Sequence, residues 1–161
     1  MRTVIADVET GGVLDTHPTI QLAALVVDES WHEIASFEQK IAFDVGRCDP
    51  EALALNHYDP EAWEDALAPH VVAAKFAAFV RPYADVKMVS KRPPFRPYAV
   101  AQLAGYNALT FDLPRIKALF GTSFFPCSFM VRDVLQRVLW HYDEQGGAPE
   151  NFKLSTVAAA L

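Results

Sequence analysis

Two carboxylates, Asp7 and Glu9, interrupt the end of an apolar run near the start of the chain. The apolar residues of this run are Val4, Ile5, Ala6 and Val8. Such a run predicts a strand buried on both faces. Residues two apart on a strand share a face, so the acids should lie side by side, where they repel each other and lose hydration unless they share a cation. The pair therefore predicts a metal site, although a strand that merely ends in polar residues, with one carboxylate capping a turn, has the same pattern.

A second acidic site follows a later strand. Residues 99–106 are predicted to form a buried strand, after which Asn107 turns the backbone and a helix over residues 111–120 begins around Asp112. An Asp at a helix start is commonly just an N-cap. Ligands of open α/β sheets, however, gather at the carboxyl ends of strands, where both acidic sites lie. Asp7, Glu9 and Asp112 together predict a site of hard oxygen ligands for Mg²⁺ or Mn²⁺.

The other elements predict an α/β domain with a mixed sheet. Strands are expected over residues 19–27 and 33–43, in an antiparallel meander with the first strand. Asp49-Pro50-Glu51 and Asp59-Pro60-Glu61 each predict the start of a short helix. The later elements expected are a helix over 69–80, a basic loop over 87–97, a strand over 124–130, and helices over 132–142 and 153–161.

Composition favours a single globular domain of 161 residues, with 52% hydrophobic and 21% charged residues. No apolar run is long enough for a membrane span, no signal peptide is evident, and the two cysteines have no CxxC spacing, so a cytoplasmic protein is expected. The net charge of −6 argues against a broad nucleic-acid-binding surface. A local basic patch can still bind a phosphate backbone. The candidates for one are Arg81, Lys87, Lys91, Arg92 and Arg96.

Two motifs resemble those of the DEDD, DnaQ-like 3′–5′ exonucleases of the RNase H-like superfamily. Asp7-Val8-Glu9-Thr10-Gly11 is similar to the first motif, and Tyr106-Asn107…Phe111-Asp112 to the second. Residues 49–57 resemble the segment between these motifs, and Tyr106 and the spacing from Asn107 to Asp112 are similar to the exonuclease I branch. The resemblance implies an α/β, RNase H-like exonuclease fold, with a central mixed five-stranded sheet flanked by helices.

The family's third motif, a His followed by an Asp, is missing from the 161 residues. Residues 153–161 resemble the helix that leads into it, so residues 1–161 are expected to be one exonuclease-like domain without its last helix. The five histidines do not match the motif, and Asp133 is expected to cap a helix or to support the site from behind. The sequence predicts weak metal binding and poor hydrolysis for residues 1–161 alone, and activity for a full-length form.

The resemblance also implies a two-metal mechanism. Asp7 would bridge two divalent cations, Mg²⁺ or Mn²⁺, while Glu9 completes one site and Asp112 holds the other. One metal would activate a water and the second would stabilise the leaving 3′ oxygen. The implied substrate is the 3′ end of single-stranded DNA or RNA, and the missing His would be the general base.

Two groups of residues are candidates for substrate contacts. Thr10, Gly11, Leu14 and Asn107 would lie near the terminal nucleotide, although Leu14 is equally well explained as a loop residue that covers the core. In the basic loop, Lys91, Arg92 and Phe95 would follow the single strand, with cations on phosphates and an aromatic ring on a base. A solvated loop accounts for that segment equally well.

Three other functions remain open from the sequence. The first is a catalytically silent nucleic-acid-binding or scaffold domain on the same fold. The second is another RNase H-like metal nuclease, such as an endonuclease, which would differ in its products. The third is an unrelated α/β domain in which the acids are fortuitous.

Overall fold

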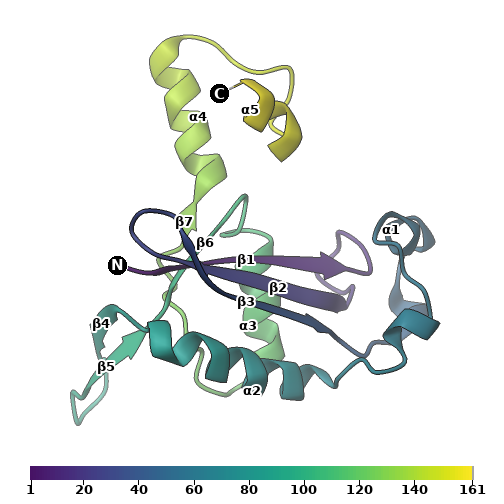
Figure 1. Ribbon diagram of the computed structural model, residues 1–161, viewed down its shortest axis with the longest axis horizontal. Helices are drawn as coiled ribbons and strands as arrows, with labels where there is room; N and C mark the ends of the chain where they lie inside the picture. Colours follow the sequence, from purple (N-terminus) through teal and green to yellow (C-terminus); the bar gives the residue numbers. More distant parts are fainter. Residues whose placement is uncertain (161) are drawn as a thin grey trace.

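A mixed five-stranded sheet forms the centre of the molecule, which the computed structural model describes over residues 1–160 (Figure 1). The strand order is β3-β2-β1-β6-β7. β2 pairs antiparallel with β1 and β3, whereas β6 runs parallel to β1 and β7 parallel to β6. The strand bounds are β1 Thr3–Thr10, β2 Thr19–Val27, β3 Glu33–Lys40, β6 Gln102–Gly105 and β7 Arg132–Asp133. The predicted fold class is therefore confirmed.

Two helices, α2 (Pro69–Val80) and α3 (Asp112–Phe120), pack against one face of this sheet. Alternate side chains of β1 meet them in the core, where Val4, Phe76 and Ile116 are fully buried. The expectation that β1 is buried on both faces is wrong. Ile5, Asp7 and Glu9 project from the other face and are partly or largely exposed, because α2 and α3 pack only against the face that carries Val4.

Short capped turns connect β3 to α2. Asp49 caps α1 (Pro50–Leu55) by accepting the Glu51 N–H at 2.9 Å, as its sequence predicts. The second Asp-Pro-Glu signal opens only a single 3₁₀ turn, η2 (Glu61–Trp63), where Asp59 accepts the Glu61 N–H. Two further 3₁₀ turns are η1 (Val45–Arg47) and η3 (Arg81–Tyr83).

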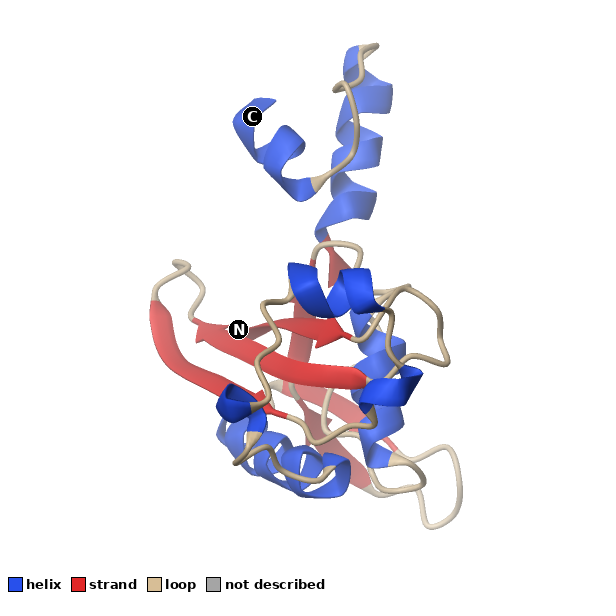
Figure 2. Ribbon diagram, turned by 90° about the vertical axis from the view of Figure 1, so that its right-hand side faces the viewer, coloured by secondary structure: helices blue, strands red, loops and turns tan. Residues whose placement is uncertain are grey.

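The last two helices, α4 (Val134–Gln145) and α5 (Leu154–Ala160), stand away from the sheet beside each other (Figures 1 and 2). Asp133 caps α4 by accepting the Leu135 N–H at 3.0 Å, which confirms its predicted role as a cap. None of the helices in the described part of the chain is long and apolar enough to cross a membrane.

The predicted basic loop over residues 87–97 is instead a hairpin, in which β4 (Val86–Val89) pairs antiparallel with β5 (Pro97–Val100). The three prolines of this segment predicted a loop, because proline interrupts the hydrogen bonding of a strand. Two of them, however, lie in the turn, and Pro97 is the first residue of β5. The predicted strand over residues 99–106 is divided between β5 and β6 at Ala101.

The predicted strand over residues 124–130 is wrong. A single bridge joins Cys127 to Ala101, and β7 forms later, at Arg132. Pro126 has no N–H for a regular ladder, and the Ser128 hydroxyl accepts the Met130 N–H. The apolar run therefore passes beside the sheet without pairing along its length.

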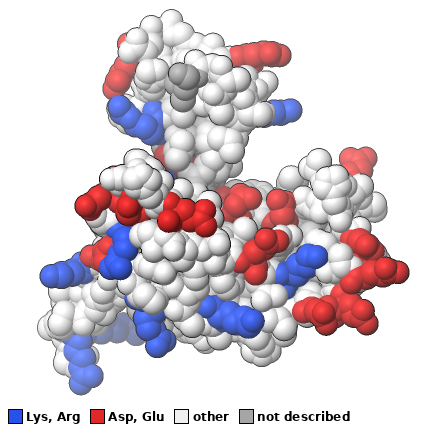
Figure 3. All heavy atoms as spheres, in the orientation of Figure 1, with Lys and Arg blue, Asp and Glu red and all other residues white. Residues whose placement is uncertain are grey.

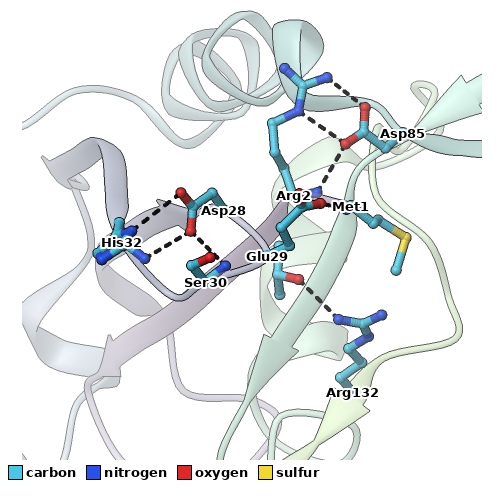
Figure 4. Close-up of polar contacts among 9 residues, drawn as sticks. Met1, Arg2, Asp28, Glu29, Ser30, His32, Asp85 and Arg132 are labelled. Atoms are coloured by element: carbon cyan, nitrogen blue, oxygen red, sulfur yellow. Dashed lines mark hydrogen bonds and ion pairs between the residues drawn. The ribbon is translucent and has the colours of Figure 1, made fainter.

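A polar cluster fixes the end of the sheet at which β1 begins (Figure 4). Arg2 donates from its backbone N–H and its Nε to Asp85, each at 2.9 Å, and a further guanidinium contact completes the pair. These bonds hold the pKa of Asp85 well below its usual range, at about 2. Because Asp85 directly precedes β4, the pair fastens the β4–β5 hairpin to the start of β1.

Candidate active site

The carboxyl end of β1 carries Asp7 and Glu9 on one face, as the strand period predicts. Asp7 lies opposite Ala23 of β2 and is exposed, whereas Glu9 lies opposite Gln21 and is half-buried. Partial loss of water raises the pKa of Asp7. The pKa of Glu9 is raised as well, first by burial and then by the negative charge of Asp7. The two carboxylates therefore interact electrostatically across one residue of strand.

Asp112 brings a third carboxylate to the same strand. It is the first residue of α3, but it does not cap the helix, since the cap position belongs to Phe111. Its Oδ1 accepts the N–H of Val8, the residue between Asp7 and Glu9, at 3.0 Å. Asp112 is only 3% exposed. The N-cap interpretation of Asp112 is thus wrong, and its side chain joins α3 to the carboxyl end of β1.

Burial raises the pKa of Asp112 to about 6, and the charge of Asp7 adds to this rise. The hydrogen bond from Val8 and the nearby Arg115 act in the opposite direction but are smaller effects. Negative charge is therefore disfavoured in this part of the protein, and a bound cation would relieve both the desolvation and the repulsion.

Within residues 1–160, no group of three or more His, Cys, Asp or Glu side chains is arranged to hold a metal ion. The carboxylates of Asp7, Glu9 and Asp112 are near enough for their charges to interact but do not form a closed three-ligand cluster. Carboxylate oxygens are the donors that Mg²⁺ and Mn²⁺ prefer. The donor set therefore fits a divalent cation by type.

The residues of the turn between β1 and β2 that were predicted to meet substrate differ in how accessible they are. Thr10 is buried, and its hydroxyl donates to the Gly12 carbonyl at 2.8 Å. Gly11 lies against Cys48, whose Sγ would be 2.3 Å from an added Cβ, so a side chain does not fit there. Leu14 is 59% exposed and free to contact a ligand. Of the turn residues predicted to meet substrate, Leu14 is thus the most accessible.

Arg115 holds this turn against α3, a role that the sequence reasoning missed. Its guanidinium donates to the carbonyls of Val13 at 2.9 Å and Phe111 at 3.0 Å, and lies 3.8 Å from the centre of the Phe111 ring. The residue is 7% exposed. The sequence could have indicated this role, because Arg115 follows Asp112 by one helical turn and lies on the same side of the helix.

Asn107 and Asp133 shape the loop that delivers Asp112. Asn107 has φ +59°, a conformation that Asn tolerates better than most residues, and its side chain accepts from the Thr110 hydroxyl. Asp133 accepts the N–H groups of Asn107 at 3.1 Å and Leu109 at 2.9 Å. Asn107 is therefore bound within the loop, and Asp133 connects this loop to α4.

A cavity of about 370 Å³ opens beside Asp7, between the sheet and the last two helices. Its lining is largely apolar and includes Ile5, Trp31, Tyr106 and Leu154. Pockets of this size and character accommodate small organic groups such as a nucleobase.

Lys91, Arg92 and Phe95 lie at the tip of the β4–β5 hairpin, and all three are exposed. The hairpin is attached where β1 begins, at the opposite end of the strand from Asp7 and Glu9 (Figure 1). The structure thus joins Asp112 to the β1 backbone between Asp7 and Glu9 and leaves the basic tip apart from these carboxylates.

Comparison with solved structures shows the same fold in E. coli exonuclease I. In complex with a dT13 oligonucleotide it is 18% identical to this chain with a TM-score of 0.69, and in complex with a 5cy-dA13 oligonucleotide it is 19% identical with a TM-score of 0.71. The zinc-bound form of an exonuclease I–ssDNA complex is 17% identical, with a TM-score of 0.69. The alignments cover 99% of this chain but only 35–36% of the other chains, about a third of their length. No protein-family model matches the sequence, and no curated protein matches it either.

Proposed function

We propose that this chain is the nuclease domain of a metal-dependent 3′–5′ exonuclease that hydrolyses single-stranded DNA from its 3′ end. The observation that carries the proposal is the contact of Asp112 with Val8, which places a buried carboxylate beside Asp7 and Glu9. The exonuclease I fold supports it, since that protein is seen with single-stranded oligonucleotides.

In this proposal Asp7, Glu9 and Asp112 would hold the divalent cations. The cations would supply water activation and stabilisation of the leaving 3′ oxygen. Leu14 would contact the terminal nucleotide, and the cavity beside Asp7 would receive a base. Arg115 and Asp133 would keep the two loops that carry the site in place.

Degradation of a 5′-labelled single-stranded oligonucleotide tests the proposal, with Mg²⁺, Mn²⁺ or EDTA. The proteins compared are the 161-residue chain, a form extended along its natural reading frame where that frame continues, and Asp7→Ala in each. A ladder of products shortened from the 3′ end, dependent on metal and lost in Asp7→Ala, is the expected result. Asp65→Ala is the matched control, because Asp65 is exposed and forms no ion pair within residues 1–160.

A nucleic-acid-binding domain without hydrolytic activity is the second candidate. It is favoured by the lack, within residues 1–160, of a cluster of three metal-ligating side chains. Oligonucleotide binding without any metal-dependent cleavage by either form would select this candidate over the exonuclease.

A further inference from the structure

We propose that the hairpin tip, defined as residues 90–96, is a second nucleic-acid contact that binds single strands without a metal. The proposal shares its substrate class with the proposed exonuclease function and adds a site separate from the carboxylates. The tip would bind phosphates through Lys91, Arg92 and Arg96 and stack a base on Phe95.

Charge is the first argument. Residues 86–100 contain four basic residues and no acidic one, in a chain whose net charge is −6. Lys91, Arg92 and Arg96 are exposed, and none of them is in an ion pair within residues 1–160. Figure 3 shows basic side chains at the lower left, where the hairpin lies, whereas acidic ones lie above them, across the middle of the view and at the right. An anionic strand is therefore attracted to the hairpin.

The aromatic ring is the second argument. Phe95 is 67% exposed between Arg92 and Arg96, although burial of a Phe ring is favourable. Single-strand sites combine cations that follow the backbone with aromatic rings on which bases stack. Phe95, Arg92 and Arg96 provide this combination of groups within residues 92–96.

The base and inner face of the hairpin are attached to the rest of the domain. Its inner face packs through Met88 and Tyr98 around a cavity of about 270 Å³ beside α3, and the Tyr98 ring meets Phe124 edge to face. Arg2 fastens its base through Asp85. Lys87 lies outward on β4, next to the tip, and adds a further cation.

Binding of a fluorescent oligo-dT of about twenty nucleotides, measured by anisotropy in EDTA, tests the proposal apart from catalysis. Compared with the unchanged chain, Lys91→Ala/Arg92→Ala/Arg96→Ala should bind more weakly, with a salt slope reduced by about two, since each cation on a single strand contributes about 0.7. Phe95→Ala should weaken binding about tenfold. The charge-matched control is Lys75→Ala/Arg137→Ala/Lys153→Ala, and the aromatic control is Trp140→Ala; all four residues are exposed on other helices or loops.

An abasic oligonucleotide of the same length separates stacking from charge. It should bind more weakly, and Phe95→Ala should not weaken it further. The proposal is overturned if the tip and control variants lose affinity equally, or if an acidic peptide of equal charge competes as well as the oligonucleotide. Binding in EDTA does not depend on cleavage, so failure of the exonuclease assay and failure of this proposal are separate results.

Discussion

The fold favours the neutral form of the Asp112 carboxyl group. Its pKa of about 6 lies above the ordinary value of 3.8, because the residue is buried and faces the charge of Asp7. The folded protein therefore binds a proton more tightly than the unfolded chain. Between about pH 4 and 6 the contribution of Asp112 to stability is lost as the pH rises. Above pH 6 the ionised group is a persistent penalty.

Asp112→Asn should accordingly stabilise the metal-free protein at pH 7. The amide still accepts the Val8 N–H but carries no charge, so the free energy of unfolding should rise by about 1–3 kcal/mol. The gain should vanish near pH 4, where the native carboxyl is protonated. Urea denaturation in EDTA at both pH values measures it, with Asp65→Asn, an exposed carboxylate outside the ion pairs of residues 1–160, as the control.

Bound metal should reverse the order of stability of the native chain and Asp112→Asn. A cation that binds only the folded state stabilises it in proportion to its affinity, and Asp112→Asn removes a charged ligand. Mg²⁺ or Mn²⁺ should therefore stabilise the native chain more than the variant at pH 7. Equal stabilisation of both would show that Asp112 takes no part in metal binding.

At the scale of elements, Asp133 controls how the second acidic loop meets the sheet. It accepts three backbone N–H groups, from Asn107, Leu109 and Leu135. Asp133→Ala removes the α4 cap and leaves two loop donors without a partner, so we expect a loss of about 2–3 kcal/mol of unfolding free energy. Asp143→Ala, an exposed carboxylate on the same helix, should change it by less than about 0.5 kcal/mol. A similar loss in both variants would contradict the role of Asp133.

Elements with a strong apolar periodicity could be predicted from the sequence. Elements whose position depends on a pairing partner distant in the sequence could not. The apolar period fixed β2 and α2 at the residues expected, and Asp49-Pro50 set the start of α1. The hairpin depends on the pairing of Val86 with Val100, and the division of the strand at Ala101 depends on the hydrogen bond from its N–H to the Pro126 carbonyl. A local sequence pattern does not contain these partners. Asp7, Glu9 and Asp112 could be singled out by type and position, whereas the contacts of Arg115 depend on how a distant turn folds back.

For the whole molecule, the two proposed contacts are far apart. Asp7 lies four residues along β1 from Thr3, which pairs with Gln102, and β5 begins five residues before Gln102. At about 3.3 Å per residue, these segments separate Asp7 from the base of the tip by up to roughly 30 Å. A single strand of several nucleotides can therefore occupy both contacts.

Substrate length should consequently decide whether the hairpin matters. In the form of the protein that shows exonuclease activity, Lys91→Ala/Arg92→Ala/Arg96→Ala should lower kcat/KM about tenfold or more on an oligonucleotide of about twenty nucleotides. On a trinucleotide, which fills only the carboxylate site, the same variant should match the native protein. The loss on the long substrate should be in KM and should fade at high salt, since the tip binds the strand and does not touch the scissile bond. An equal loss on both substrates would place the effect at the carboxylates and contradict a separate contact.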